Sequence, residues 1–406
     1  MSTSASRHWY QGISRQAWRA LVAAMCGWML DAMDVMLYAF ALTSIRDEFD
    51  LTGATAGALA SVTLVASAAG GILFGALADR IGRVRALTVS ILVYSAFTAM
   101  TATAGSIQEL VLWRTLVGIG LGGEWSAGSV LVAESWPAEH RGKAIGLMQS
   151  GWAIGYLMAA LLAALILPTL GWRPLFAVGA APALLAAWIR TRVEEPAVWK
   201  ESSQVRGTTA QAQPVVARLL LATAVTSCVL FAYWGLFTWM PTFLAAPAGS
   251  GGAGMGVVKS SLWIVPMQIG AFLGYASFGF LGDRIGRRPA FIGFLVAAAA
   301  LVPAYGACAG SATALLILGP FIGFFGHGYF SVFGALLSEI FPTRRRATLQ
   351  GIAYNAGRAL SALAPATIGS LADRHGLAAA LTLTSVFFLI GAGLMFCLPE
   401  TKGRAL

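Results

Sequence analysis

The sequence predicts an all-α integral membrane protein with twelve transmembrane helices in two six-helix repeats. Three observations predict this fold: the composition, a series of long apolar runs, and an internal repeat. Of the 406 residues, 58% are hydrophobic and 11% are charged, whereas soluble domains average about 25% charged residues. A soluble fold of this size could not hide so much apolar surface, so the solvent must be lipid. Open sheet edges cannot survive in lipid, which leaves a helical bundle.

Twelve apolar runs are long enough to span a bilayer, which takes about 20 residues of helix. Mostly short loops join them, and we expect no appended soluble domain. The runs are centred near residues 30, 66, 95, 121, 156, 181, 231, 269, 299, 325, 359 and 388.

The net charge of +10 reflects topology. With the N-terminus placed inside, most of the 27 basic residues fall in inside segments, and only Arg46, Arg173, Lys259 and Arg374 fall outside. This asymmetry follows the positive-inside rule and predicts that both termini are cytoplasmic. We therefore expect a lipid bilayer as the surroundings and no nucleic-acid partner.

Two pairs of similar segments reveal the repeat. "GALADRIGRVRA" from Gly75 matches "GFLGDRIGRRPA" from Gly279, at a separation of 204 residues. "ESWPAEHRG" from Glu134 matches "EIFPTRRRA" from Glu339, at a separation of 205. Two pairs at nearly one offset indicate two six-helix halves of the same orientation.

A long polar stretch divides these halves. We predict an N-terminal half over residues 1–190, a cytoplasmic linker over 191–217 and a C-terminal half over 218–406. Two homologous halves around a central site are typical of transporters that work by rocking.

The repeated "G-x-x-x-D-R-x-G-R" loops and the "R-x-x-x-G-x-G-x-G" of the fourth helix resemble those of the major facilitator superfamily. The resemblance covers essentially the whole chain. "GWMLDAMDVMLYAFAL", "GGEW", "ESWPAEHRGKAIGLMQSGWAIG" and "YNAGRALSALAP" are most similar to the sialate:proton symporter group, which includes lactate, pyruvate and sialic acid permeases.

The repeated loops carry acid and arginine residues that can face one another. Asp79 and Arg83 lie four residues apart, which places them on one side of a helix end. The resemblance implies that such residues latch the inner gate, whereas topology anchoring alone is the alternative. The candidate gating residues are Asp79, Arg83, Glu134 and Arg141 in the first half, and Asp283, Arg287, Glu339 and Arg346 in the second.

Two carboxyl groups, Asp31 and Asp34, lie in the middle of the first apolar run. A charged group at mid-bilayer costs roughly 2.5–3.5 kcal/mol on insertion scales. Two nearby carboxylates resist ionising together, which suits a proton carrier. Glu124 and Arg114 of the fourth helix join them as proton-coupling candidates. In the alternative interpretation, buried arginines neutralise the acids permanently.

Arg358 lies near the middle of the eleventh helix and is the main candidate for substrate binding. Its guanidinium group fits a carboxylate with two parallel hydrogen bonds, although it could instead offset an acid of the first helix. Tyr354 and Asn355 precede it on roughly the same face. His327 and Gln149 complete the candidate set, with aromatic packing as the alternative for His327.

These features predict proton-coupled uptake of a small organic anion by alternating access. Lactate, pyruvate, sialic acid and aromatic acids all suit an arginine-plus-acid site. The alternatives are a sugar or polyol:proton symporter, followed by a drug or metabolite efflux antiporter. We expect no enzyme, no metal and no cofactor besides the proton. The resemblance implies a monomer in a bacterial inner membrane.

Overall fold

The structure is a computed structural model, and it describes residues 12–137, 141–196, 215–331, 336, 340 and 346–400. The helices of the first half are α1 (Arg15–Phe49), α2 (Gly53–Ile81), α3 (Arg83–Thr101), α4 (Ile107–Ser135), α5 (Arg141–Leu170), α6 (Trp172–Ala177), η1 (Val178–Ala180) and α7 (Pro182–Arg192). Those of the second half are α9 (Val215–Ala245), η2 (Ala248–Ser250), α10 (Gly256–Ile285), α11 (Arg287–Ala307), α12 (Ala312–His327), α14 (Arg346–Ser361), α15 (Leu363–His375) and α16 (Leu377–Met395).

The all-α prediction is confirmed, because the described residues form helices and no strand. Within the residues that the structure describes, ten helical stretches are long and apolar enough to cross a membrane, with α6 to α7 counted as one stretch. The shorter apolar helix α12 occupies the tenth predicted run. The eleventh run is divided into α14 and α15 at Ala362. Each predicted run therefore corresponds to helical structure.

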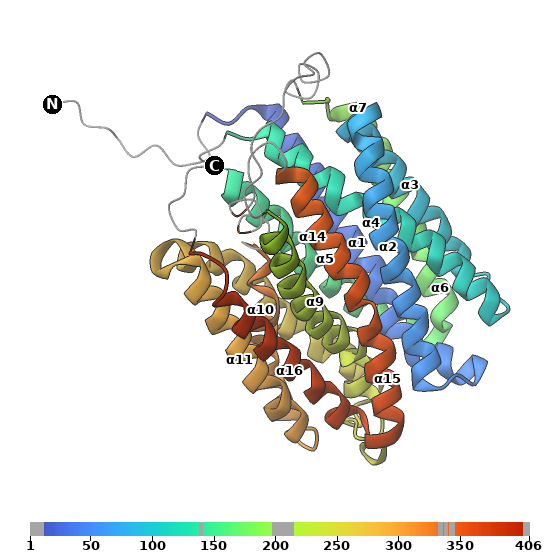
Figure 1. The fold of residues 1–406 in the computed structure, drawn as a ribbon. Helices are drawn as coiled ribbons and strands as arrows, with labels where there is room; N and C mark the ends of the chain where they lie inside the picture. Colours follow the sequence, from blue (N-terminus) through green and yellow to red (C-terminus); the bar gives the residue numbers. More distant parts are fainter. Residues whose placement is uncertain are drawn as a thin grey trace.

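The helices form one bundle in which α1–α7 lie beside α9–α16 (Figure 1). The halves meet where α2 packs against α14 and α15, where α5 packs against α10, and where α1 packs against α9. The first two contacts join the second helix to the eleventh and the fifth to the eighth, so the repeat relates them. The predicted domain boundaries stay a prediction.

Glycine allows the central helices to approach closely. A Cβ atom on Gly155 of α5 would lie 1.8 Å from the carbonyl oxygen of Met29 in α1. A Cβ atom on Gly122 of α4 would lie 2.0 Å from the carbonyl oxygen of Ser67 in α2. Such small-residue contacts are typical of helix packing in membranes, and here they bring α5 close to α1 and α4 close to α2.

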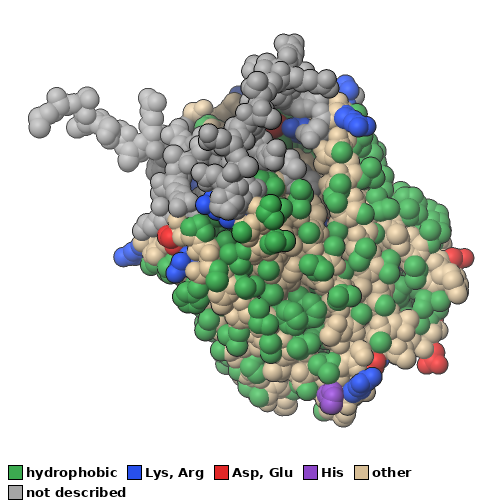
Figure 2. Space-filling view, in the orientation of Figure 1, with side chains coloured by type: hydrophobic (Ala, Val, Ile, Leu, Met, Phe, Trp, Pro, Cys, Tyr) green, Lys and Arg blue, Asp and Glu red, His purple; other side chains and the backbone are tan. Residues whose placement is uncertain are grey.

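The surface suits a bilayer. Hydrophobic side chains cover the middle of the visible face, and charged side chains gather towards its two ends (Figure 2). Leu165 and Leu184 are 74% and 77% exposed, which water would disfavour and lipid would not. We call the end that carries Arg83 and Arg287 the basic end, and the end that carries Arg46 and Arg374 the opposite end.

Candidate functional site

The structure pairs Asp34 of α1 with Arg114 of α4. Both side chains are buried, and Arg114 Nη1 lies 3.5 Å from Asp34 Oδ2. The hydroxyl group of Thr98 donates a hydrogen bond to Asp34 Oδ1. The Arg114 guanidinium lies over the Tyr38 ring, 5.2 Å from its centroid. Asp34 therefore matches the alternative prediction of an acid offset by a buried arginine.

Asp31 and Glu124 lie in a different environment. Both are fully buried, and no carboxylate oxygen of either has a hydrogen-bond partner among the described residues. The Asp31 carboxylate interacts electrostatically with Arg358 and Asp34, and Glu124 interacts with Asp31. Glu124 fills the space beside Gly27, where a Cβ atom would lie 1.9 Å from its Oε1 atom. Because unpaired buried carboxylates are costly as anions, these two acids suit proton binding best.

Arg358 of α14 lies where two pockets meet. It is 2% exposed, and its guanidinium group makes no ion pair or hydrogen bond within the described part of the chain. The space between the lining atoms, open solvent included, is about 420 Å³ in one pocket and about 320 Å³ in the other, and both pockets are lined by Arg358 and Trp234. A buried guanidinium with open donors beside a cavity is an anion-binding arrangement.

Aromatic side chains from several helices form most of the smaller pocket. α1, α5, α9, α10 and α14 all contribute, so both halves of the molecule build its wall. Gln149 of α5 lies among these residues, and its Oε1 atom has no hydrogen-bond partner in the described structure. The sequence interpretation missed these aromatic residues, which are Trp28, Trp152, Tyr233, Trp234, Tyr275 and Phe330.

The remaining candidates for substrate binding are spread out. The Tyr354 ring lines the smaller pocket and stacks on Trp125 at 4.2 Å between centroids. Asn355 donates to the carbonyl of Gly351 and packs against α2, and it lines neither pocket. His327 Nδ1 lies 3.1 Å from the Gly323 carbonyl, and the ring packs on Phe237. His327 thus occupies an aromatic packing position outside both pockets.

One expected pair of gating residues is present at the basic end. Arg83 Nη2 lies 3.1 Å from Glu134 Oε1, and Arg83 also donates to the carbonyl of Ala78. The pair lies within the first half, and its role in gating stays a prediction. Glu339 lies outside the described residues, and so do the side chains of four other candidates: Asp79, Arg141, Asp283 and Arg346.

Two carboxylates that the sequence interpretation missed bind helix N-termini at the basic end. Glu195 accepts hydrogen bonds from the backbone N–H groups of Arg83, Val84 and Arg85 at the start of α3. Glu400 accepts from the N–H groups of Arg287 and Arg288 at the start of α11. Negative charge is stabilising at a helix N-terminus. The two glutamates are 205 residues apart, so the repeat offset could have revealed them.

The two halves are joined near the opposite end. The Asp373 carboxylate of α15 accepts hydrogen bonds from the N–H groups of Gly53 and Ala54, at 3.1 and 3.2 Å. Deeper in the bundle, the Tyr156 hydroxyl donates to the carbonyl oxygen of Phe237 at 3.1 Å. These contacts close the opposite end in this structure.

Comparison with known proteins identifies the family of this chain. A "Cis,cis-muconate transport protein" of Acinetobacter baylyi is 32% identical over 95% of this chain and 94% of its own. The "Sialic acid transporter NanX" of Escherichia coli is 28% identical over 94% and 93%. The partially occluded, inward-open structure of the xylose transporter XylE from E. coli has the same fold, with a TM-score of 0.78. The two sequences are 20% identical, and the match covers 97% of this chain and 100% of that chain. The Major Facilitator Superfamily matches residues 24–277 and 260–405. The chain is a transporter that belongs to the major facilitator superfamily.

Proposed function

We propose that this protein takes up a small organic anion together with protons. The observation that carries the proposal is the buried Arg358 guanidinium, which has open donors and lies where the two pockets meet. A neutral sugar gives no reason for a buried arginine, because unsatisfied charged donors are costly. Relatives named for muconate and sialic acid support a carboxylate as substrate.

The aromatic wall of the smaller pocket favours a flat, unsaturated or aromatic acid. Trp28, Trp152 and Trp234 line it with large planar rings. Planar ligands stack on such rings. Among organic acids, we therefore place planar carboxylates ahead of sialic acid and lactate.

Asp31 provides the coupling to protons in this proposal. In the empty site, the ionised Asp31 carboxylate attracts Arg358 across the interface between the halves. Protonation of Asp31 frees the guanidinium for a substrate carboxylate, so that proton and substrate bind together. Glu124 is a second proton acceptor beside it.

We place the basic end in the cytoplasm of a bacterium, because basic residues mark the inner side, and treat the chain as a monomer.

Uptake into proteoliposomes tests the proposal. Nicotinate, cis,cis-muconate, sialic acid, lactate and xylose are supplied with and without an acidic-outside gradient. We expect accumulation of a planar acid driven by the gradient. Accumulation of xylose alone, or acid uptake that ignores the gradient, would reject the proposal.

Two substitutions separate the roles of the acid and the arginine. Asp31→Asn should abolish gradient-driven accumulation but keep exchange of labelled for unlabelled substrate, because exchange needs no net proton movement. Arg358→Gln should weaken substrate binding by about 10- to 100-fold, since it removes a charged hydrogen-bonding partner. Asp47→Asn and Arg374→Gln, which make the same changes at exposed positions of the opposite end, are matched controls.

A further inference from the structure

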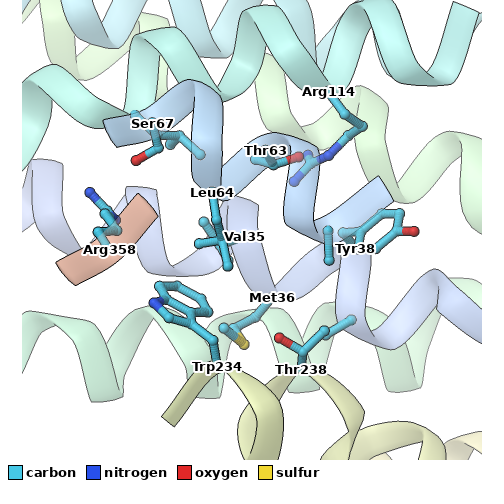
Figure 3. A pocket seen from close by; sticks show the side chains of 13 residues that line it. Val35, Met36, Tyr38, Thr63, Leu64, Ser67, Arg114, Trp234, Thr238 and Arg358 are labelled. Carbon is cyan, nitrogen blue, oxygen red and sulfur yellow. The ribbon is translucent and has the colours of Figure 1, made fainter. Parts of the chain in front are cut away.

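A second arginine lines the larger pocket. Arg114 of α4 and Arg358 of α14 both contribute to its wall, and Figure 3 shows them on opposite sides of it, with Leu64 and Val35 between them. Arg114 is 1% exposed and Arg358 is 2% exposed, so both guanidinium groups are buried in the bundle. One carboxylate needs only one of these two guanidinium groups.

Arg114 keeps hydrogen-bonding capacity despite its ion pair. The 3.5 Å separation between its Nη1 atom and Asp34 Oδ2 is longer than a usual charged hydrogen bond. Its Nε and Nη1 atoms have no hydrogen-bond partner among the described residues, and the same is true of Arg358 Nε. Buried donors of this kind are costly when unsatisfied, and a bound carboxylate would satisfy them.

Each arginine has an acid of α1 as its electrostatic partner. Asp31 interacts with Arg358, and Asp34 pairs with Arg114. The two acids lie one helical turn apart on α1, and their arginine partners belong to opposite halves of the molecule. The site therefore contains two acid–arginine units, and in each unit protonation of the acid would leave the guanidinium for an external carboxylate.

The wall between the two units is mostly apolar, and its hydroxyl groups include those of two threonines and one serine. Val35, Met36 and Leu64 line it together with Thr63, Ser67 and Thr238. Resting on the proposed organic-anion function, we propose that the preferred substrate is a dicarboxylate with an apolar body, whose two carboxylates bind Arg358 and Arg114. The net charge of the loaded site supports this class. When Asp31 and Asp34 are both protonated, the two positive guanidinium groups are balanced by the two negative carboxylates of the substrate.

The test compares two probes that differ only at one end. trans,trans-Muconate and sorbate share the same hexadiene chain, but sorbate has a methyl group where muconate has its second carboxylate. Binding to the purified full chain in detergent is measured by titration calorimetry, at a pH at which both probes are fully ionised. We expect muconate to bind at least about tenfold more tightly, since it gains a second charged pair.

Substitution of Arg114 assigns the second carboxylate to its partner. Arg114→Gln should bring the muconate and sorbate affinities to within about threefold of one another, and Arg114→Lys should reduce the preference in part, because lysine keeps the charge without the planar fork. Arg374→Gln, at an exposed position, should keep the preference. The comparison on the unsubstituted chain is decisive even where a variant fails to fold.

The outcomes separate this inference from the proposed function. Equal affinities for muconate and sorbate would overturn the dicarboxylate assignment and leave organic-anion uptake standing. A preference for muconate that survives in Arg114→Gln would overturn the role of Arg114. If neither probe binds and no acid accumulates in proteoliposomes, both proposals fall.

Discussion

Asp373 is expected to hold the opposite end closed. Its carboxylate lies across the interface between the halves, where it binds the first two N–H groups of α2 at 3.1 and 3.2 Å. Arg46 Nη2 lies 3.7 Å from Asp373 Oδ1. All three contacts are lost when the halves separate at this end, so they stabilise only the closed arrangement.

The size of the effect follows from exposure and charge. A carboxylate at a helix N-terminus contributes about 0.3–1 kcal/mol at an exposed site and up to about 2 kcal/mol when partly buried. The Asp373 side chain is 35% exposed and the Arg46 side chain 28% exposed, so the ion pair adds little. We therefore expect Asp373→Asn to raise the population open at the opposite end by a factor of about 5 to 30, which corresponds to about 1–2 kcal/mol.

Distances between spin labels measure this shift. The labels are placed at Thr103 and Gly310, which are exposed near the opposite end of the two halves. The parent chain has its cysteines replaced by serine at Cys26, Cys228, Cys308 and Cys397. Double electron–electron resonance should show a larger long-distance population in Asp373→Asn than in the parent.

Asp47→Asn is the control for this experiment, because it removes the same charge from an exposed position near Arg46. It should leave the distances unchanged. An unchanged distribution in Asp373→Asn, or an equal shift in Asp47→Asn, would refute the latch.

Three further predictions concern packing, helix capping and charge movement. Gly155→Ala should strongly lower the thermal unfolding temperature, because its Cβ atom would lie 1.8 Å from the backbone oxygen of Met29. Gly146→Ala is the control, because a Cβ atom there would have nothing within 4 Å and should leave the unfolding temperature unchanged. Equal unfolding temperatures for the two variants would contradict the close packing. Glu195→Gln should lower the free energy of unfolding by about 1 kcal/mol, because the charge at the α3 N-terminus is lost. Glu194 is exposed, and Glu194→Gln should have no such effect in the same unfolding assay. Uptake of a dicarboxylate with two protons should be electroneutral, so a potassium diffusion potential should not change its rate in proteoliposomes; a clear dependence on potential would exclude this stoichiometry.

Much of the fold could be predicted because its signals are local in the sequence. The length of an apolar run indicates a spanning helix wherever its neighbours lie, and the offset of 204 to 205 residues reveals the repeat without a structure. Arg83 and Glu134 were expected as neighbours from recurring motifs, and they form an ion pair. Glu195 and Glu400 obey the same offset but were missed, because a single matching glutamate in unlike surroundings is a weak signal.

The partners of the buried charges could not be predicted from spacing. Asp31 and Asp34 share a face of α1 in the sequence pattern, yet Asp34 pairs with Arg114 whereas Asp31 makes no ion pair in the described structure. This difference depends on how α1 is rotated against α4 and α14, which is a tertiary property. The aromatic pocket was missed for the same reason, since several helices each contribute only one or two of its residues.

The repeat supplies a symmetric scaffold, but the site on it is asymmetric. The acids lie on α1 of the first half, and the positions one repeat away are Gly235 and Leu236, which cannot ionise. Arg358 lies on α14 of the second half. In the proposed mechanism, Asp31 and Arg358 lie on different halves, and their attraction changes whenever a proton or a substrate carboxylate binds between them. A substrate anion with a protonated Asp31 restores the neutrality of the empty site, whereas either ligand alone leaves a net buried charge, which is costly. Closure around the site is therefore favoured with both ligands or with neither, and this is the condition that symport requires.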